Sequence, residues 1–89
     1  MTLGQKLKEL RVKNDLTIAY VAFKAKISET SVSYYENDRN EISLKKYMCL
    51  CEIYGVEPFE TYKSVDGVYD PDFEESLQKE EYDNEEEQR

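Results

Sequence analysis

The chain has 89 residues, enough for one compact domain and too few for two. Its formal net charge of −8 argues against a polyanionic partner such as nucleic acid if the charge is evenly distributed. No window approaches the ~18 to 20 consecutive apolar residues of a membrane span, and the N-terminal sequence has no apolar core like that of a secretory signal. We therefore expect a cytoplasmic protein with no membrane partner.

The first half of the chain predicts three helices. Apolar residues recur at helical spacing from Leu3, which predicts a first helix that ends near Asn14. Thr17 can cap a second helix and Ser28 a third, with only about three residues between the two helices. The residues predicted to face inward on these two helices are Val21, Ala22, Ala25, Val32 and Tyr35.

The second half predicts two more helices. One begins after Ser43 and stops at Gly55, and Pro58 suits the first turn of a short fifth helix. The apolar stripe of the fourth helix consists of Leu44, Tyr47, Met48, Cys51 and Tyr54. No segment alternates like a half-buried strand, so the predicted fold is all-α with five helices.

The residue types needed for catalysis or metal binding are scarce. Cys49 and Cys51 would lie on nearly opposite sides of a helix, and the chain has no histidine to complete a zinc site. There is also no glycine-rich phosphate loop and no paired nucleophile and base. We expect no metal, no cofactor and no enzymatic activity, with Cys51 as a small core residue.

The acidity is concentrated in the C-terminal part. Residues 1–63 contain ten Lys or Arg against nine Asp or Glu, whereas residues 64–89 contain two against eleven, a net charge of −9. We interpret 1–63 as the domain and 64–89 as an acidic tail, with one helix from about 71 to 82 and disorder beyond. The tail either solubilises the protein or competes with phosphate for the basic groups of the domain.

Two short helices joined by a tight turn form an arrangement that places the second helix, residues 28–36, in the major groove of DNA. The surrounding sequence resembles the lambda-repressor-like helix-turn-helix family of Cro, phage repressors and XRE-like transcriptional regulators, over residues 3 to about 62. The resemblance is carried by LGQKLKELR at the start, Leu16-Thr17, Val21-Ala22, Ile27-Ser28, Val32-Ser33, Tyr35-Glu36-Asn37, Ser43-Leu44 and Tyr54-Gly55-Val56.

The resemblance implies residue roles. The outward, base-reading positions are Glu29, Thr30, Ser31, Ser33 and Tyr34. Phosphate contacts, many of them through backbone amides at helix starts, fall at Thr17, Ser28, Asn37, Arg39, Asn40, Ser43, Lys45 and Lys46. Arg11 and Glu36 match positions that pair as a semi-buried salt bridge between the first and third helices.

The chain departs from the family pattern at three positions. Ile18 replaces a glutamine that usually reaches a phosphate, and Lys26 and Asp38 replace glycines. A positive φ at either glycine position costs only about 1 kcal/mol, and aspartate adopts it readily.

The second helix is apolar nearly all round, which predicts a partner surface there. Together with residues of the fifth helix and the tail, the expected partner or dimer contacts are Ile18, Tyr20, Phe23, Phe59, Tyr62, Tyr69, Phe73 and Leu77. Tyr and Phe lying along the surface of a small domain is the simpler interpretation.

Two functions remain open. The first is a sequence-specific, repressor-like transcriptional regulator from a bacterium, phage or mobile element, acting as a homodimer on a double-stranded DNA operator. The alternative is a protein-interaction module on the same scaffold, an antirepressor or a regulator that binds a regulatory protein and little or no DNA.

Overall fold

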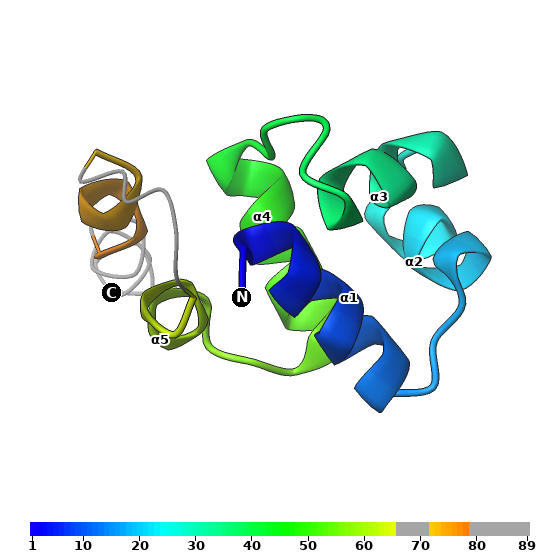
Figure 1. Ribbon diagram of the computed structural model, residues 1–89, viewed down its shortest axis with the longest axis horizontal. Helices are drawn as coiled ribbons and strands as arrows, with labels where there is room; N and C mark the ends of the chain where they lie inside the picture. The colour runs from blue at the N-terminus through cyan, green and yellow to red at the C-terminus, as the bar shows by residue number, and fades with distance from the viewer. Residues whose placement is uncertain (66–71, 79–89) are drawn as a thin grey trace, which may run out of the picture.

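The computed structural model describes residues 1–65 and 72–78, and every regular element in these residues is a helix. In chain order, the helices are α1 (Leu3–Lys13), α2 (Ile18–Ala25), α3 (Glu29–Glu36), α4 (Leu44–Tyr54) and α5 (Pro58–Lys63), followed by a helical segment at 72–78. Helix α4 lies in the middle of the molecule, with α2 and α3 on one side and α5 and 72–78 on the other (Figure 1). The predicted all-α fold is confirmed.

The helix starts follow the polar residues that precede them. Thr17, Ser28 and Ser43 are the N-caps of α2, α3 and α4, and each side-chain oxygen accepts a hydrogen bond from a backbone N–H in the first turn. Thr2 caps α1 in a reciprocal arrangement with Gln5. These caps satisfy backbone donors that a helix start would otherwise leave unpaired.

Two helices end in a residue with left-handed backbone geometry. Gly55 ends α4 with φ 70°, and Lys26 ends α2 with φ 59°. Asp38, in the loop after α3, has φ 57°, and Asp15, between α1 and α2, has φ 56°. The sequence analysis singled out Gly55, Lys26 and Asp38, but it did not single out Asp15.

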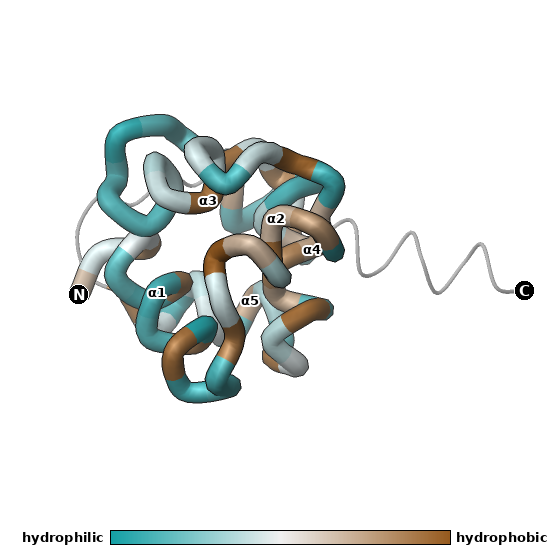
Figure 2. The backbone as a smooth tube through the Cα atoms, turned by 90° about the vertical axis from the view of Figure 1, so that its right-hand side faces the viewer, coloured by the Kyte–Doolittle hydropathy of each residue, from teal (hydrophilic) through white to brown (hydrophobic). Residues whose placement is uncertain are grey.

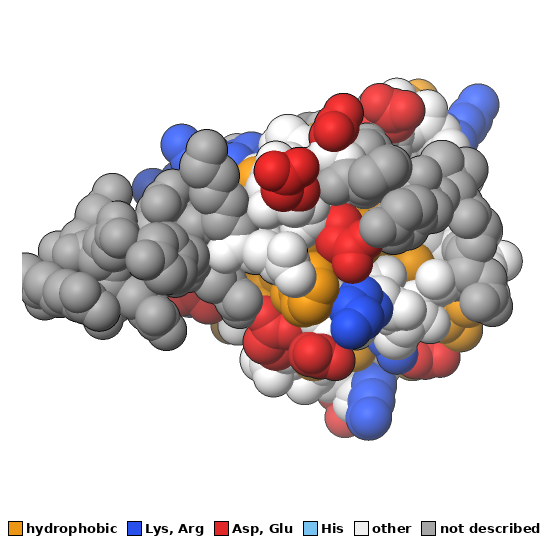
Figure 3. Space-filling view, turned by 90° about the vertical axis from the view of Figure 1, so that its left-hand side faces the viewer, with side chains coloured by type: hydrophobic (Ala, Val, Ile, Leu, Met, Phe, Trp, Pro, Cys, Tyr) orange, Lys and Arg blue, Asp and Glu red, His pale blue; other side chains and the backbone are white. Residues whose placement is uncertain are grey.

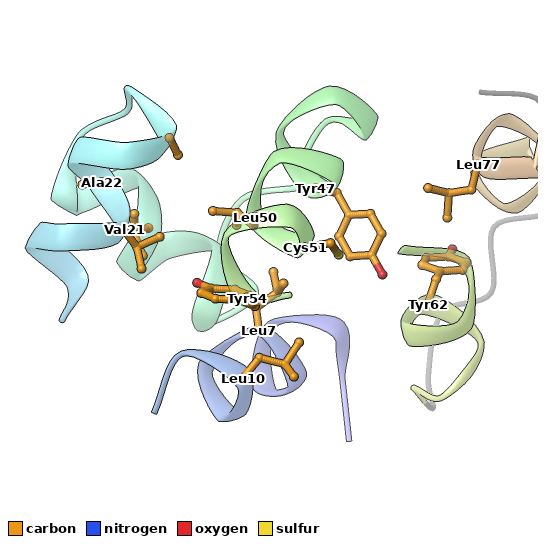
Figure 4. Packing of buried hydrophobic residues seen from close by; sticks show 12 residues of the cluster. Leu7, Leu10, Val21, Ala22, Tyr47, Leu50, Cys51, Tyr54, Tyr62 and Leu77 are labelled. Atoms are coloured by element: carbon orange, nitrogen blue, oxygen red, sulfur yellow. The ribbon is translucent and has the colours of Figure 1, made fainter. Parts of the chain in front are cut away.

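The core is built around α4. Its buried residues contact α1 on one side and α2 on another, as the close view in Figure 4 shows for Leu7, Val21, Leu50 and Tyr54. The buried hydrophobic residues are Leu7, Leu10, Val21, Ala22, Ala25, Val32, Tyr47, Leu50, Cys51, Tyr54, Tyr62 and Leu77. Burial raises the pKa of the Cys51 thiol to about 11, so Cys51 is an unreactive core residue, as predicted.

An aromatic cluster joins α4 to α5 and the segment at 72–78. The rings of Tyr62 and Phe73 stack with centroids 4.9 Å apart, and both meet the ring of Tyr47 edge-on. Leu77 is 1% exposed and lies near this cluster, as Figure 4 shows. The Tyr47 hydroxyl donates to the Pro58 carbonyl at 2.7 Å.

This cluster corrects the expectation for the partner surface. Tyr62, Phe73 and Leu77 pack within the chain because their rings and methyl groups cover the otherwise exposed end of α4. Tyr62 and Leu77 are buried in the core and Phe73 is partly buried against it, so these three residues do not form an exposed surface. The helical segment at 72–78 lies inside the range predicted for a tail helix, whereas Tyr69 and residues 79–89 lie outside the described residues.

None of the helices in residues 1–65 and 72–78 combines the length and apolar composition needed to cross a membrane.

Candidate nucleic-acid interface

Helices α2 and α3 are joined by a turn at residues 26–28. The left-handed conformation of Lys26 reverses the chain, and the N–H of Ile27 donates to the Ala22 carbonyl at 3.1 Å. Ser28 then starts α3, its Oγ accepting from the Ser31 N–H at 3.0 Å. Val32 is 1% exposed and holds the inner side of α3 against the core. The result is a helix-turn-helix with the opposite side of α3 facing outward.

The C-terminal end of α3 is fixed to α1 by a bidentate salt bridge. Arg11 Nε lies 2.7 Å from Glu36 Oε2 and Nη2 lies 3.1 Å from Oε1, while Nη1 donates to the Leu16 carbonyl at 2.9 Å. The side chains are 12% and 4% exposed. Hydrogen bonding to Glu36 raises the pKa of the Arg11 guanidinium. The pair expected from the family resemblance is therefore present, and it sets the orientation of α3.

The five outward residues of α3 divide into two groups. Glu29, Thr30 and Tyr34 are exposed, and among the described residues the side chains of Glu29 and Thr30 have no hydrogen-bond partner. Ser31 and Ser33 are half-buried and already bonded. The Oγ of Ser31 accepts from the Ser28 hydroxyl at 2.9 Å, and the Oγ of Ser33 accepts from the Asn37 side-chain amide at 3.5 Å. Glu29, Thr30 and Tyr34 are thus the residues most available to an incoming partner.

A cation lies beside this outward face. The Arg39 guanidinium carbon is 5.1 Å from the centroid of the Tyr34 ring, and the Arg39 N–H donates to the Tyr34 carbonyl at 2.8 Å. Arg39 belongs to the loop after α3, which is hydrophilic in Figure 2, viewed from the side of α2 and α3. The sequence placed Arg39 among phosphate contacts and Tyr34 among base contacts, and the structure brings the two side chains together.

Three of the predicted phosphate contacts are helix caps. The Thr17 Oγ1 accepts from the Tyr20 N–H at 3.0 Å, and the Ser43 Oγ accepts from the Lys46 N–H at 3.2 Å. Ser28 plays the same part in α3. The acceptor atoms of these three residues are used within the chain, and the Ser28 hydroxyl also donates to the Ser31 Oγ. The hydroxyl hydrogens of Thr17 and Ser43 and the remaining first-turn amides can still donate to an anion.

The two lysines of α4 lie in different environments. Lys46 Nζ donates to the Ala25 carbonyl at 3.2 Å, which joins the end of α2 to the start of α4. Lys45 is exposed and lines a groove on the outer side of α4.

The two asparagines among the predicted phosphate contacts lie at the end of α3 and after it. Asn37 ends α3, with hydrogen bonds from its backbone and side chain to the last turn, and Asn40 is exposed in the following loop. Only Arg39 of the predicted cationic contacts lies against the outward face of α3.

Asp38 has a role that the sequence did not reveal. Its carboxylate accepts from the Gly4 N–H at 3.0 Å and from the Thr2 hydroxyl, so the loop after α3 caps the first turn of α1. The sequence marked Asp38 only as a residue in place of glycine. A cap supplied from a distant loop has no signal in local spacing.

The residues of α2 that the sequence assigned to a partner surface differ in their exposure. Ile18 is half-buried against the core, whereas Tyr20 is 45% exposed and Phe23 is 79% exposed. On α5, Phe59 is partly buried and the Lys63 amine lies 5.1 Å from its ring centroid. Tyr20 and Phe23 therefore form the exposed apolar surface of α2.

The far side of the molecule has a different character. Figure 3 views it from the side of α5, where acidic side chains (red) lie at several places beside hydrophobic areas (orange) and scattered basic side chains (blue). The described side chains visible on this side do not show the predominance of basic groups expected at a phosphate backbone.

Comparison with known proteins agrees with this geometry. A family model described as helix-turn-helix matches residues 7–60. No curated protein matches the chain significantly. A match of this kind indicates a DNA-binding helix-turn-helix regulator, and it covers α2, the turn and α3 in full. The chain belongs to the lambda-repressor-like helix-turn-helix family.

Proposed function

We propose that the protein is a sequence-specific, repressor-like transcriptional regulator that inserts α3 into the major groove of an operator. The main support is the stacking of Arg39 on Tyr34, beside exposed Glu29 and Thr30 on a helix held by the Arg11–Glu36 salt bridge. It places a cation beside a helix that has no basic residue of its own. A nearly neutral domain can therefore still present a positive group where it approaches DNA.

Each outward residue of α3 can recognise a different base feature. A glutamate accepts from cytosine N4, and a threonine exchanges hydrogen bonds or contacts the thymine methyl group. The Tyr34 hydroxyl can donate or accept a hydrogen bond, while the Tyr34 ring lies against the Arg39 guanidinium. Phosphates are bound by the first-turn amides of α2, α3 and α4 together with Arg39.

A homodimer on a palindromic or repeated operator follows from the small footprint of one domain, because two-fold pairing multiplies specificity.

The −9 charge of residues 64–89 weakens non-specific binding by competing with phosphate. For this tail effect, a variant with Glu85, Glu86 and Glu87 changed to Gln is compared with the natural chain on random DNA at two salt concentrations. Equal affinities at both would exclude it.

The test of DNA binding starts with selection of binding sites from random duplexes by the full chain, followed by gel-shift titration. Thr30→Ala and Tyr34→Phe should change the preferred sequence, since the first removes a base contact and the second removes only a hydroxyl and keeps the support for Arg39. Arg39→Ala should weaken all sequences alike and lower the salt dependence by about one phosphate contact. Lys8→Ala, at an exposed position on α1, is the control and should change neither the preferred sequence nor the affinity.

The second candidate function is a protein-interaction module, an antirepressor or a partner-binding regulator. It is favoured by one observation, the exposure of Tyr20 and Phe23 on α2, which leaves two large apolar side chains in solvent. Absence of binding to any duplex at low salt would reject the first function and favour this one. If the Phe23→Ser variant still binds DNA, the exposed apolar surface of α2 is distinct from the DNA-binding surface of α3.

A further inference from the structure

The outer side of α4 carries a groove of about 940 Å³ that the core does not use. Its apolar members are partly exposed, and its charged members, Lys45 and Glu52, are exposed. The residues that line it are Ser43, Leu44, Lys45, Met48, Cys49, Glu52, Val56 and Pro58. The fully buried residues of α4 lie on the other side of the helix, whereas the apolar residues of the groove pack against the core with one part of each side chain and expose the rest.

Charge in this groove is arranged in a self-complementary way. Lys45 and Glu52 are separated by about two turns of α4, which places them in line on one side of the helix. The midpoint between them falls between Met48 and Cys49, both partly exposed. Neither charged group has an ion pair or hydrogen bond to another described residue through its side chain.

We propose that this groove binds the same groove of a second copy of the chain, with the two α4 helices antiparallel across a two-fold axis near Met48 and Cys49. In such an isologous contact, Lys45 of each protomer meets Glu52 of its partner, and both ion pairs form at once. A parallel arrangement would instead place Lys45 opposite Lys45 and Glu52 opposite Glu52.

The occupant is a second copy because the groove is complementary to itself. An apolar centre formed by Met48 and Cys49, with one cation before it and one anion after it on the same side of α4, matches its own two-fold image. An acidic or a basic partner would satisfy only one of the two charges and bring the other next to a like charge. The apolar centre supplies the burial, and the charges select the orientation.

This contact deepens the proposed function, since it rests on the expectation of a dimer and gives that dimer a surface other than α5 and the tail. It also gives Lys45 a role other than phosphate contact. The test is made without DNA, so that failure of the dimer surface and failure of DNA binding are separate results.

The dimer dissociation constant of the full chain is measured by sedimentation equilibrium, with folding of each variant checked by circular dichroism. Lys45→Glu and Glu52→Lys should each raise it about tenfold or more, because two-fold symmetry turns one substitution into two repulsive contacts. The double variant restores both ion pairs in reversed order and should return to within about threefold of the natural chain. Lys8→Glu, an exposed position outside the groove, is the matched control.

A second measurement does not depend on the charge variants. Cys49 would lie near Cys49 of the partner subunit, and Cys51 is buried, so a short bis-maleimide should join two chains through Cys49 alone. Cys49→Ser should abolish that product. The proposal is overturned if the natural chain stays monomeric, if the single charge variants dimerise as well as it does, or if the double variant is no better than the singles.

Discussion

The Lys6–Glu9 and Arg11–Glu36 salt bridges differ in their exposure to water. Lys6 and Glu9 are 24% and 45% exposed and lie one turn apart on α1, whereas Arg11 and Glu36 are 12% and 4% exposed and join two helices. An exposed pair contributes little because solvent and salt screen it. A buried pair matters mainly when one partner is lost, since the other charge is then left without compensation.

Glu36→Gln should therefore lower the free energy of unfolding by about 3 kcal/mol, because the Arg11 guanidinium loses its counter-charge while remaining out of water. Glu9→Gln is the matched control and should cost less than about 0.5 kcal/mol. Urea denaturation followed by circular dichroism measures both. Equal losses in the two variants would mean that the buried pair does not anchor α3.

For the residues with left-handed backbone geometry, the sequence predicts the conformation but not the side-chain contacts. Lys26 and Asp38 were both recognised as replacements for glycine, and both adopt positive φ. The structure separates them, since Lys26 is exposed while Asp38 bonds to Thr2 and Gly4. Backbone conformation could be predicted from local pattern, but the partners of Asp38 depend on how α1 and the loop meet in three dimensions.

At the scale of elements, the helices and their caps were predictable because each depends on neighbours in sequence. Apolar spacing and the residues Thr17, Ser28, Ser43 and Gly55 defined the four long helices nearly to the residue. The site was less predictable. The outward residues of α3 follow from helical periodicity, whereas the stacking of Arg39 on Tyr34 depends on the path of the loop after α3.

Gly4 determines how closely α1 approaches α3. A Cβ added there would lie 2.6 Å from Asp38 Oδ1, 2.8 Å from the Glu36 carbonyl oxygen and closer still to that of Tyr35. Two of these three neighbours are backbone atoms and cannot turn aside. The approach brings the first turn of α1 within hydrogen-bond distance of Asp38.

Gly4→Ala tests which of two opposed effects is larger. Helix propensity favours alanine by about 1 kcal/mol, while the forced separation of two packed helices costs about 1 to 3 kcal/mol and breaks the Asp38 cap as well. We expect net destabilisation and a lower melting temperature. Lys8→Ala on the exposed side of α1 is the control, with little change expected. A more stable Gly4→Ala variant would show that α1 and the loop after α3 can move apart at little energetic cost.

At the scale of the whole molecule, the boundary drawn from charge does not coincide with the boundary of the core. Residues 64–89 are acidic as a group, yet Phe73 and Leu77 pack against Tyr47 and Tyr62. Composition averages over a segment, and two apolar residues within an acidic stretch are enough to dock a short helix. A chain cut after residue 63 would therefore lose part of the core along with the acidic charge.

Leu77→Ala measures how much this docking contributes. Leu77 is 1% exposed, so truncation should cost about 2 to 5 kcal/mol if its neighbours cannot close around the cavity, and less if the segment at 72–78 detaches. Glu75→Ala, exposed in the same segment, should change stability by no more than about 0.5 kcal/mol. Both are measured by urea denaturation of the full chain, followed by circular dichroism. Equal stability of the two variants would mean that α4 and α5 form the core without residues 72–78, and the domain would then end at α5.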